Sequence, residues 1–305
     1  MVQRTRILLL IPHLGGGGAE HVIALLARGL SREKYEVHLG LVQQSGAARD
    51  ALPPSVKVHG LGAGRARAGA LPLLRLAWRL RPDVVLSGAT EISFLILLLR
   101  PFLPRKTSVL VRQNGTVSSA LAFGSVPRSM QLLYRLLYRR PDRVICQSRA
   151  MAKDLVQVAG ISEEQIAVLP NPVDLEGIRA AWGDPSAWSG PGPHLLAVGR
   201  LSREKGFDLL LEAFAAVRHR FPHADLILAG AGREEAKLKS LCRSLELEMA
   251  VRFVGQVNCP YVFFPGATLF VLSSRHEGMP NALLEAAAAG LPIVATPASG
   301  GVWTC

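Results

Sequence analysis

Cysteine is scarce in this chain of 305 residues. Its four cysteines, Cys146, Cys242, Cys259 and Cys305, lie far apart and show no short repeated spacing. A structural zinc site or a disulfide scaffold needs closely and regularly spaced cysteines, so the sequence favours neither. Few and scattered cysteines fit a reducing cytoplasm best.

Long apolar runs are missing too. A membrane-spanning helix needs about 18 successive apolar residues, and the segment 92–99 is far shorter. The N-terminal stretch MVQRTRILLLIPHLGGGG begins basic and then apolar, as a signal peptide does, but it passes into glycines without a small-residue cleavage pattern. We therefore expect a buried first strand there.

The usual dinucleotide and P-loop signatures are absent. The glycines Gly15–Gly18 follow the first apolar run, but they do not form G-x-G-x-x-G, and no Lys-Ser/Thr pair follows them. No acidic residue ends the second predicted strand, where Val42 and Gln43 stand. An NAD-dependent dehydrogenase is therefore disfavoured.

Acidic residues are few in the first half of the chain. Residues 1–175 contain 23 Lys+Arg and 11 Asp+Glu, whereas residues 176–305 contain 12 of each, so the net charge of +12 belongs to the first half. This excess indicates that the first half faces an anionic surface or substrate. Nucleic acid is disfavoured because no recognition motif or aromatic interleaving occurs. An anionic membrane surface is the better interpretation. The alternative is that the excess of arginine only reflects a GC-rich genome.

What the chain does contain is an alternation of short apolar runs and helical patterns, with 49% apolar residues to fill two cores. This alternation predicts an α/β fold with parallel sheets covered on both faces. Residues 46–69, rich in Gly, Ala, Pro and Arg, are predicted as a mobile basic loop region. Turn-forming residues after the NPVD segment at Asn171–Asp174 predict a linker. The expected organisation is an N-terminal domain at 1–172, a linker at 173–192 and a C-terminal domain at 193–305. 

Two stretches of the first half follow predicted strands and can reach a ligand there. Gly17 and Gly18 lie in a strand-to-helix turn, where backbone can approach a ligand closely; a merely flexible turn is the alternative. Arg112, Gln113 and Asn114 follow the strand predicted at 108–112 and are candidate acceptor or sugar contacts, although polar residues are ordinary in loops.

The strongest candidate site is SSRHEGMPNALLEAAAAG at Ser273–Gly290. With the apolar runs Leu269–Leu272 before it and Ile293–Ala295 after it, this stretch predicts strand, loop, helix and strand, with Asn281 capping the helix and Gly290 ending it. Glu277 is expected in the loop and Glu285 in the first helical turn, both facing the crevice above the sheet. The alternative is a pair of solvated glutamates.

A cationic pair complements these carboxylates. Arg200 and Lys205 flank a loop after the strand predicted at 194–198, and guanidinium and ammonium groups bind phosphate oxygens. Either residue alone is weak support, because such side chains in loops are usually just solvated.

At this point the chain resembles a known family, the retaining glycosyltransferases of the GT-B fold, family four. The likeness is carried by GGAE at Gly17–Glu20, NPVD at Asn171–Asp174, VGRLSREKGFDLLLEAF at Val198–Phe214, FVGQV at Phe253–Val257 and the E-x7-E signature within Ser273–Thr296. The resemblance implies two Rossmann-like domains facing each other across a cleft, the second binding a nucleotide-sugar donor and the first an acceptor.

The resemblance also implies roles for single residues. Arg200 and Lys205 would hold the diphosphate, Glu285 the ribose hydroxyls and Glu277 hydroxyls of the transferred sugar. Gly17 and Gly18 would approach the distal phosphate of the donor or the acceptor, and further donor contacts would come from Gly255, Val257, Gly278, Met279, Pro280, Asn281 and Ala282. It implies transfer with retention, without a bound metal or cofactor, and the chain lacks an Asp-x-Asp motif in a suitable loop.

The remaining expectations concern substrates and completeness. UDP is the expected donor base, with a GDP-sugar as the alternative, and the acceptor is expected to be a glycan or lipid-linked saccharide of envelope or polysaccharide synthesis at the cytoplasmic face of a membrane. Two departures from the family stand out. Gln113-Asn114-Gly115 replaces a histidine of many relatives, and the chain ends at Cys305, so an incomplete second domain is expected. The alternative function is a non-catalytic remnant that binds nucleotide sugar.

Overall fold

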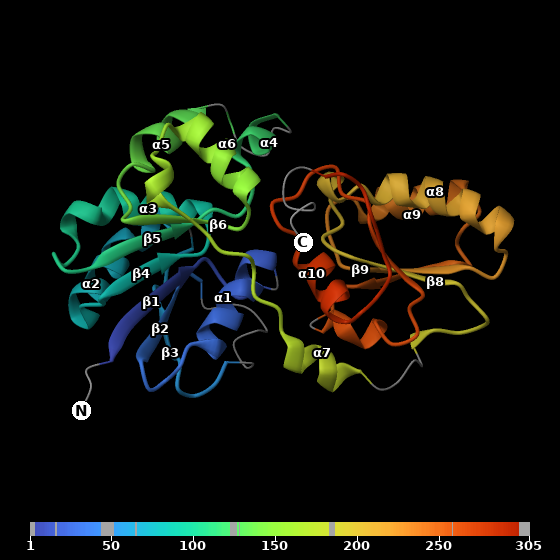
Figure 1. Cartoon of the computed structure of the whole chain (residues 1–305), viewed down its shortest axis with the longest axis horizontal. Helices are drawn as coiled ribbons and strands as arrows, with labels where there is room; N and C mark the ends of the chain where they lie inside the picture. Colours follow the sequence, from blue (N-terminus) through green and yellow to red (C-terminus); the bar gives the residue numbers. More distant parts are fainter. Residues whose placement is uncertain are drawn as a thin grey trace. The chain divides into compact units, whose positions relative to one another are not determined.

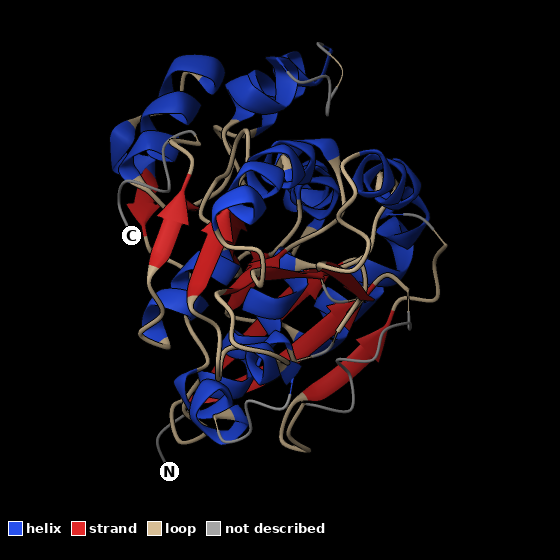
Figure 2. Cartoon of the chain, turned by 90° about the vertical axis from the view of Figure 1, so that its right-hand side faces the viewer, coloured by secondary structure: helices blue, strands red, loops and turns tan. Residues whose placement is uncertain are grey.

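The structure is a computed structural model, and it describes residues 4–15, 17–43, 52–64, 66–122, 127, 129–182, 187–257 and 259–298. The chain divides into two compact units, Met1–Pro172 and Val173–Cys305. Each unit has one parallel sheet with helices on both faces (Figures 1 and 2). The expected α/β fold of two Rossmann-like parts is therefore confirmed.

The sheet of the first unit has the strand order β3-β2-β1-β4-β5-β6-β7. Its strands are β1 (Thr5–Ile11), β2 (Tyr35–Leu41), β3 (Lys57–Gly60), β4 (Val84–Ser87), β5 (Ser108–Arg112), β6 (Arg143–Cys146) and β7 (Ile166–Val168). Its helices are α1 (Gly18–Gly29), α2 (Ala70–Leu80), α3 (Thr90–Leu99), α4 (Val117–Ala122), α5 (Ser129–Leu137) and α6 (Arg149–Ala159), with short 3-10 turns η2 (Ala66–Gly69), η3 (Arg100–Phe102) and η4 (Glu163–Gln165).

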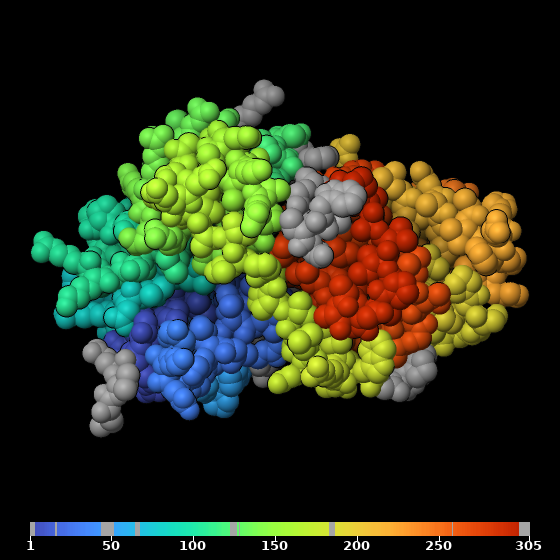
Figure 3. Space-filling view, viewed as in Figure 1, coloured from blue at the N-terminus to red at the C-terminus, as the bar shows by residue number. Residues whose placement is uncertain are grey.

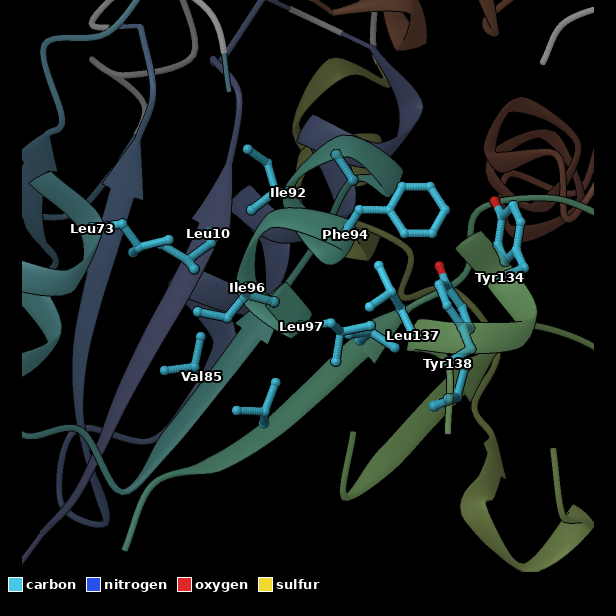
Figure 4. Close-up of a cluster of buried hydrophobic side chains, with 14 of the residues drawn as sticks. Leu10, Leu73, Val85, Ile92, Phe94, Ile96, Leu97, Tyr134, Leu137 and Tyr138 are labelled. Atoms are coloured by element: carbon cyan, nitrogen blue, oxygen red, sulfur yellow. The ribbon is translucent and has the colours of Figure 1, made fainter. Parts of the chain in front are cut away.

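Alternation along β1 divides the core of this unit into two layers. Leu8 and Leu10 pack with residues of α2, α3, α5 and α6, whereas Leu9 and Ile11 pack with Ile23 of α1. Figure 4 shows the first layer, with Leu10 near the side chains that the helices supply. Because successive side chains of a strand point to opposite faces, a strand buried on both faces must be apolar throughout, as LLLI is.

The sheet of the second unit has the order β10-β9-β8-β11-β12. Its strands are β8 (His194–Val198), β9 (Asp225–Ala229), β10 (Val251–Gly255), β11 (Leu269–Leu272) and β12 (Ile293–Ala295). Its helices are α7 (Leu175–Ala181), α8 (Phe207–Arg220), α9 (Glu235–Ser244) and α10 (Asn281–Ala288), with 3-10 turns η6 (Arg203–Lys205) and η7 (Pro260–Phe263). One core layer lies under α8 and α9, and the other under η7, α7 and α10.

Two segments differ from the expected loops. The range 46–69 contains strand β3 and turn η2, and the prediction of a loop throughout was therefore wrong for its described residues; residues 46–51 and 65 lie outside the described part. β3 is a short edge strand with no run of apolar residues to mark it. The range predicted as a linker carries α7, whose Ile178 is buried with Trp188 in the second unit. The boundaries 1–172, 173–192 and 193–305 stay a prediction.

Within the described ranges, none of the helices combines the length and the apolar character that crossing a membrane requires.

An ion-pair cluster on β2 makes the stability of the first unit depend on pH. Glu36 accepts hydrogen bonds from Lys57 at 2.6 Å and Arg6 at 3.0 Å. These bonds lower the pKa of its carboxyl from 4.5 to about 2. Because the folded pKa lies below the unfolded one, the stabilisation is present above pH 4.5 and is lost as the pH falls towards 2.

We expect Glu36→Gln to flatten the acid limb of the stability profile. Between pH 6 and pH 3 the unchanged protein should lose about 1 kcal/mol more unfolding free energy than the variant, since Lys57 is largely exposed and water screens the pair. Urea unfolding at each pH measures the difference. Parallel profiles for the two proteins would contradict the assignment.

Candidate active site

The strand order of the second unit puts a topological switch point between β8 and β11. β9 and β10 continue the sheet on one side of this pair, and β12 continues it on the other. In open parallel sheets, ligands bind outside the carboxyl ends of the strands where the order reverses in this way. The loops after β8 and β11 therefore form the candidate ligand site, and they contain Lys205 and Glu277.

Gly206 lets these two loops approach each other. It has φ +62°, in the left-handed region, and a Cβ there would lie 2.1 Å from the carbonyl oxygen of Ser273. The hydroxyl of Ser273 donates a hydrogen bond of 2.9 Å to the carbonyl oxygen of Lys205. Only glycine combines this backbone conformation with so close an approach.

Arg275 ties the same loops together with its side chain. Its guanidinium donates two hydrogen bonds of 2.7 Å to the carboxylate of Asp208 at the start of α8, and a third of 2.9 Å to the carbonyl oxygen of Arg203. The hydrogen bonds from Arg275 lower the pKa of the Asp208 carboxyl. Bidentate pairs of this kind fix orientation as well as distance. Neither Arg275 nor Asp208 was predicted as a site residue, because no local pattern relates positions this far apart.

Lys205 and Glu277, both predicted as site residues, are brought together. The ammonium of Lys205 donates to Oε1 of Glu277 at 2.5 Å, and the two side chains are 21% and 11% exposed. Ser274 donates to the same oxygen at 2.6 Å. An ammonium has three N–H donors, so Lys205 can hold Glu277 and still bind anionic oxygens. Arg200, at the beginning of the same loop as Lys205, is exposed.

Glu285 lies deeper than expected. It is buried, and the hydroxyl of Tyr261 on η7 hydrogen-bonds it. Burial, followed by the charges of Glu285 and Asp174, raises the pKa of Tyr261. Tyr261 was not predicted, because only the fold brings η7 under α10.

The start of α10 corrects two expectations. Pro280 occupies the N-cap with extended backbone and no side-chain cap, so Asn281 is the first helical residue and not the cap. Glu285 consequently falls in the second turn rather than the first. The end of the helix is as predicted, since Gly290 follows the C-cap Ala289 with φ +76°. The turn residues Gly278, Met279, Pro280 and Ala282 link Glu277 to this helix.

Glycines also bring the neighbouring strand ends close together. A Cβ on Gly230, after β9, would lie 1.8 Å from the carbonyl oxygen of Gly199, after β8. Gly255 ends β10 with φ +70°, and a Cβ there would meet no atom within 4 Å, so its left-handed backbone borders open space. Val257 packs against the core layer under η7 and α10.

In the first unit, the predicted acceptor residues bond to one another. Arg112 is buried and donates to the amide oxygens of Asn114 and, at 2.6 Å, Asn171. Burial lowers its pKa to about 10. Asn114 donates to the carbonyl oxygen of Gly88 at 2.7 Å. These contacts join the loops after β4, β5 and β7 at this edge of the sheet.

Gln113 and the glycine turn behave differently. Gln113 is buried, accepts a hydrogen bond of 2.9 Å from Tyr138 and donates one of 2.8 Å to the carbonyl oxygen of Gly115. Its amide is thus turned into the unit.

Gly17 is the N-cap of α1 and Gly18 its first residue, directly after the β1 loop. No cluster of three or more His, Cys, Asp or Glu side chains suited to a metal ion occurs among the residues that the structure describes.

Comparison with known proteins decides the family. The family model described as "Glycosyltransferase Family 4" matches residues 16–176, more than half of the chain. The chain belongs to glycosyltransferase family 4. A second model, "Glycosyl transferases group 1", matches residues 180–303 and so covers the loops that contain Lys205 and Glu277. This family 4 enzyme carries out glycosyl transfer.

Two curated relatives resemble this family 4 chain over much of its length. It is 29% identical to the N-acetylgalactosamine-N,N'-diacetylbacillosaminyl-diphospho-undecaprenol 4-alpha-N-acetylgalactosaminyltransferase of Campylobacter jejuni, over 96% of this chain and 81% of the relative. It is 26% identical to the lipopolysaccharide core biosynthesis glycosyltransferase LpsE of Rhizobium meliloti, over 76% of this chain and 61% of the relative.

Among solved structures, HepE of Anabaena in complex with UDP and glucose matches with a TM-score of 0.82. The match covers 99% of this chain and 83% of HepE, at 20% identity. The likeness at this identity concerns the fold, and it agrees with the GT-B fold expected for family 4.

Proposed function

We propose that this family 4 glycosyltransferase transfers a sugar from a UDP-sugar bound at the β8/β11 switch point of its second unit. The contact between Lys205 and Glu277 carries this proposal, because it places a cation and a carboxylate at the edge where parallel sheets bind ligands. One group suits a diphosphate and the other suits sugar hydroxyls.

The chemistry follows from these charges. Breaking the anomeric C–O bond leaves negative charge on the diphosphate, and preorganised cations stabilise charge that develops in the transition state. Lys205 is held in place by Glu277 and by the backbone contacts of its loop, so little reorganisation is needed. Arg200 adds a second cation that can bind two phosphate oxygens. Glu277 accepts hydrogen bonds from the transferred sugar, and Glu285 accepts them from the ribose. In this scheme transfer retains configuration and requires no bound metal.

The choice of donor and acceptor rests on relatives. HepE was crystallised with UDP and glucose, which supports UDP over GDP. The Campylobacter relative acts on a diphospho-undecaprenol-linked sugar, and the Rhizobium relative acts in lipopolysaccharide core synthesis. We therefore infer a lipid-linked or saccharide acceptor used in envelope synthesis at the cytoplasmic face of a membrane, reached through Gly17, Gly18 and the Arg112–Asn114 loop.

A thermal-shift screen of nucleotide sugars tests the donor assignment. A UDP-sugar at about one hundred times its Kd should stabilise the fold by about 2.7 kcal/mol and raise Tm by about 5–10 °C. GDP-sugars should raise it less, and EDTA should change neither binding nor turnover. A shift with GDP-sugars alone would contradict the choice of UDP.

Product analysis completes this test. NMR of the product should show the anomeric configuration of the donor, and inversion would contradict retention. Donor binding without turnover, when lipid-linked and free saccharide acceptors are both supplied, would support the non-catalytic alternative.

A further inference from the structure

An apolar and basic surface lies on the first unit, away from the strand ends described above. It is formed by α2 and by the segment from Arg100 to Lys106 that follows α3, and we call it the α2–η3 face. Its large apolar side chains stand out: Phe102 is 63% exposed, Leu71 55% and Trp78 52%. Together with Leu103 they line an open hollow of about 820 Å³. Exposed apolar groups gathered in this way mark an interaction surface.

The exposure follows from the two-sided character of α2. Leu73, Leu76 and Ala77 are buried in the core, and Figure 4 shows Leu73 pointing at the sheet. Leu71, Arg75 and Trp78 are spaced four and three residues apart, which puts them together on the opposite side of the helix. The indole N–H of Trp78 donates to the carbonyl oxygen of Phe102 at 2.9 Å, so both segments form one surface.

The charged side chains that α2 and the Arg100–Lys106 segment supply are all basic, although Arg100 is paired with Asp142 at 2.8 Å. The sequence has no acidic residue between Asp50 and Asp83 or between Glu91 and Asp142, and both segments of the face lie within these stretches. Arg75 and Arg105 line the hollow, and Arg79 and Lys106, next in sequence to lining residues, are exposed. In Figure 3 the teal surface of the first unit corresponds to this part of the sequence.

We propose that the α2–η3 face docks on an anionic lipid membrane. Tryptophan and phenylalanine partition to the boundary between headgroups and acyl chains, and arginine stems lie along apolar surface while their guanidinium groups reach phosphates. A basic surface helix with exposed Trp and Leu is typical of segments that lie in the plane of the interface. A small-molecule site would need converging polar groups, but the hollow offers only two arginines among apolar residues.

This inference is independent of the donor site. The face contains none of the residues assigned to sugar transfer, so its variants should hydrolyse or transfer donor normally in solution. A failure to bind membranes would therefore leave the proposed transfer reaction standing, and a failure of transfer would leave the docking surface standing.

Co-sedimentation of the full chain with vesicles tests the charge requirement. Vesicles of equal parts phosphatidylcholine and phosphatidylglycerol should bind the protein, and binding should weaken with salt and with pure phosphatidylcholine. Arg75→Gln with Arg105→Gln should lower the partition coefficient about twenty-fivefold, because each basic residue near an anionic surface contributes about fivefold. The matched control, Arg220→Gln with Arg243→Gln in the second unit, should bind as the unchanged protein does.

A second pair of variants tests whether the apolar side chains of the α2–η3 face contribute to membrane binding. Leu71→Ser with Phe102→Ser should lower binding at least about tenfold, because the variant loses the favourable free energy of moving two apolar side chains from water into the membrane interface. Leu209→Ser with Met249→Ser, exposed positions of the second unit, should change nothing. Because all four side chains are exposed, circular dichroism should show an unchanged fold.

Fluorescence quenching locates the contact. Brominated lipids should quench the Trp78 emission, and Trp78→Phe should still bind while losing that quenching. Three results would overturn the proposal: equal binding of charged and neutral vesicles, loss of binding with Leu132→Ser and Leu136→Ser of α5 but not with the α2–η3 variants, or a dimer in solution that the α2–η3 variants dissociate.

Discussion

Replacing Lys205 with alanine will lower kcat for sugar transfer about 10²–10³-fold, the usual effect of removing one preorganised donor to developing negative charge. The ammonium lies 2.5 Å from Glu277, and the Lys205 side chain is only 21% exposed, so the cation is held in place before the donor binds. Initial rates at saturating donor and acceptor measure the loss. Lys205→Arg should recover little, because a planar guanidinium cannot reproduce a compact ammonium at the same place.

Lys237→Ala is the matched control for this variant. Lys237 also pairs with a glutamate, Glu234 at 3.3 Å, but it is highly exposed on α9 and should be dispensable. Both variants must remain folded at the assay temperature, as judged by Tm. Unchanged turnover in the folded Lys205→Ala protein would remove Lys205 from the mechanism.

Replacing Gly206 with alanine will have the largest effect on the scaffold of the site. The new Cβ would lie 2.1 Å from the Ser273 carbonyl oxygen, which is backbone and cannot turn aside. The loops after β8 and β11 must then separate, and this separation breaks the Ser273–Lys205 hydrogen bond. We expect a loss of at least about 3 kcal/mol of unfolding free energy, measured by urea denaturation, because overpacking and left-handed strain add.

Gly290→Ala separates these two causes. Gly290 also has a positive φ, +76°, but a Cβ there would meet no atom within 4 Å. Its replacement should therefore cost only the backbone strain, about 1–2 kcal/mol. Equal losses for the two variants would mean that the close approach to Ser273 is unimportant, and donor affinity should fall for Gly206→Ala alone.

Much of the fold could be predicted because the strands are buried on both faces. β8, β11 and β12 were predicted with the bounds that the structure shows, since each is a short apolar run between turn-forming residues. Local patterns also predicted Lys205 and Glu277 at strand ends. β3 and α7 were missed, because an edge strand and a short helix after a proline-containing segment show no comparable periodicity.

What could not be predicted depends on contacts between distant positions. Apolar runs do not reveal that β8 neighbours β11, and therefore do not place Lys205 beside Glu277. The Arg275–Asp208 pair and the Tyr261–Glu285 contact arise in the same way. The burial of Gln113 is equally invisible in the sequence, because its hydrogen-bond partners Tyr138 and Gly115 are supplied by the fold.

Hydrogen–deuterium exchange with and without UDP tests the central claim most directly, namely that the second unit binds the nucleotide at the ends of β8 and β11. Saturating UDP should slow exchange in peptides covering 199–206 and 273–285, while peptides of α9, on the outer layer of the same unit, exchange as before. Lys205→Ala should weaken that protection. Protection confined to the first unit, or no protection in either 199–206 or 273–285, would contradict this claim.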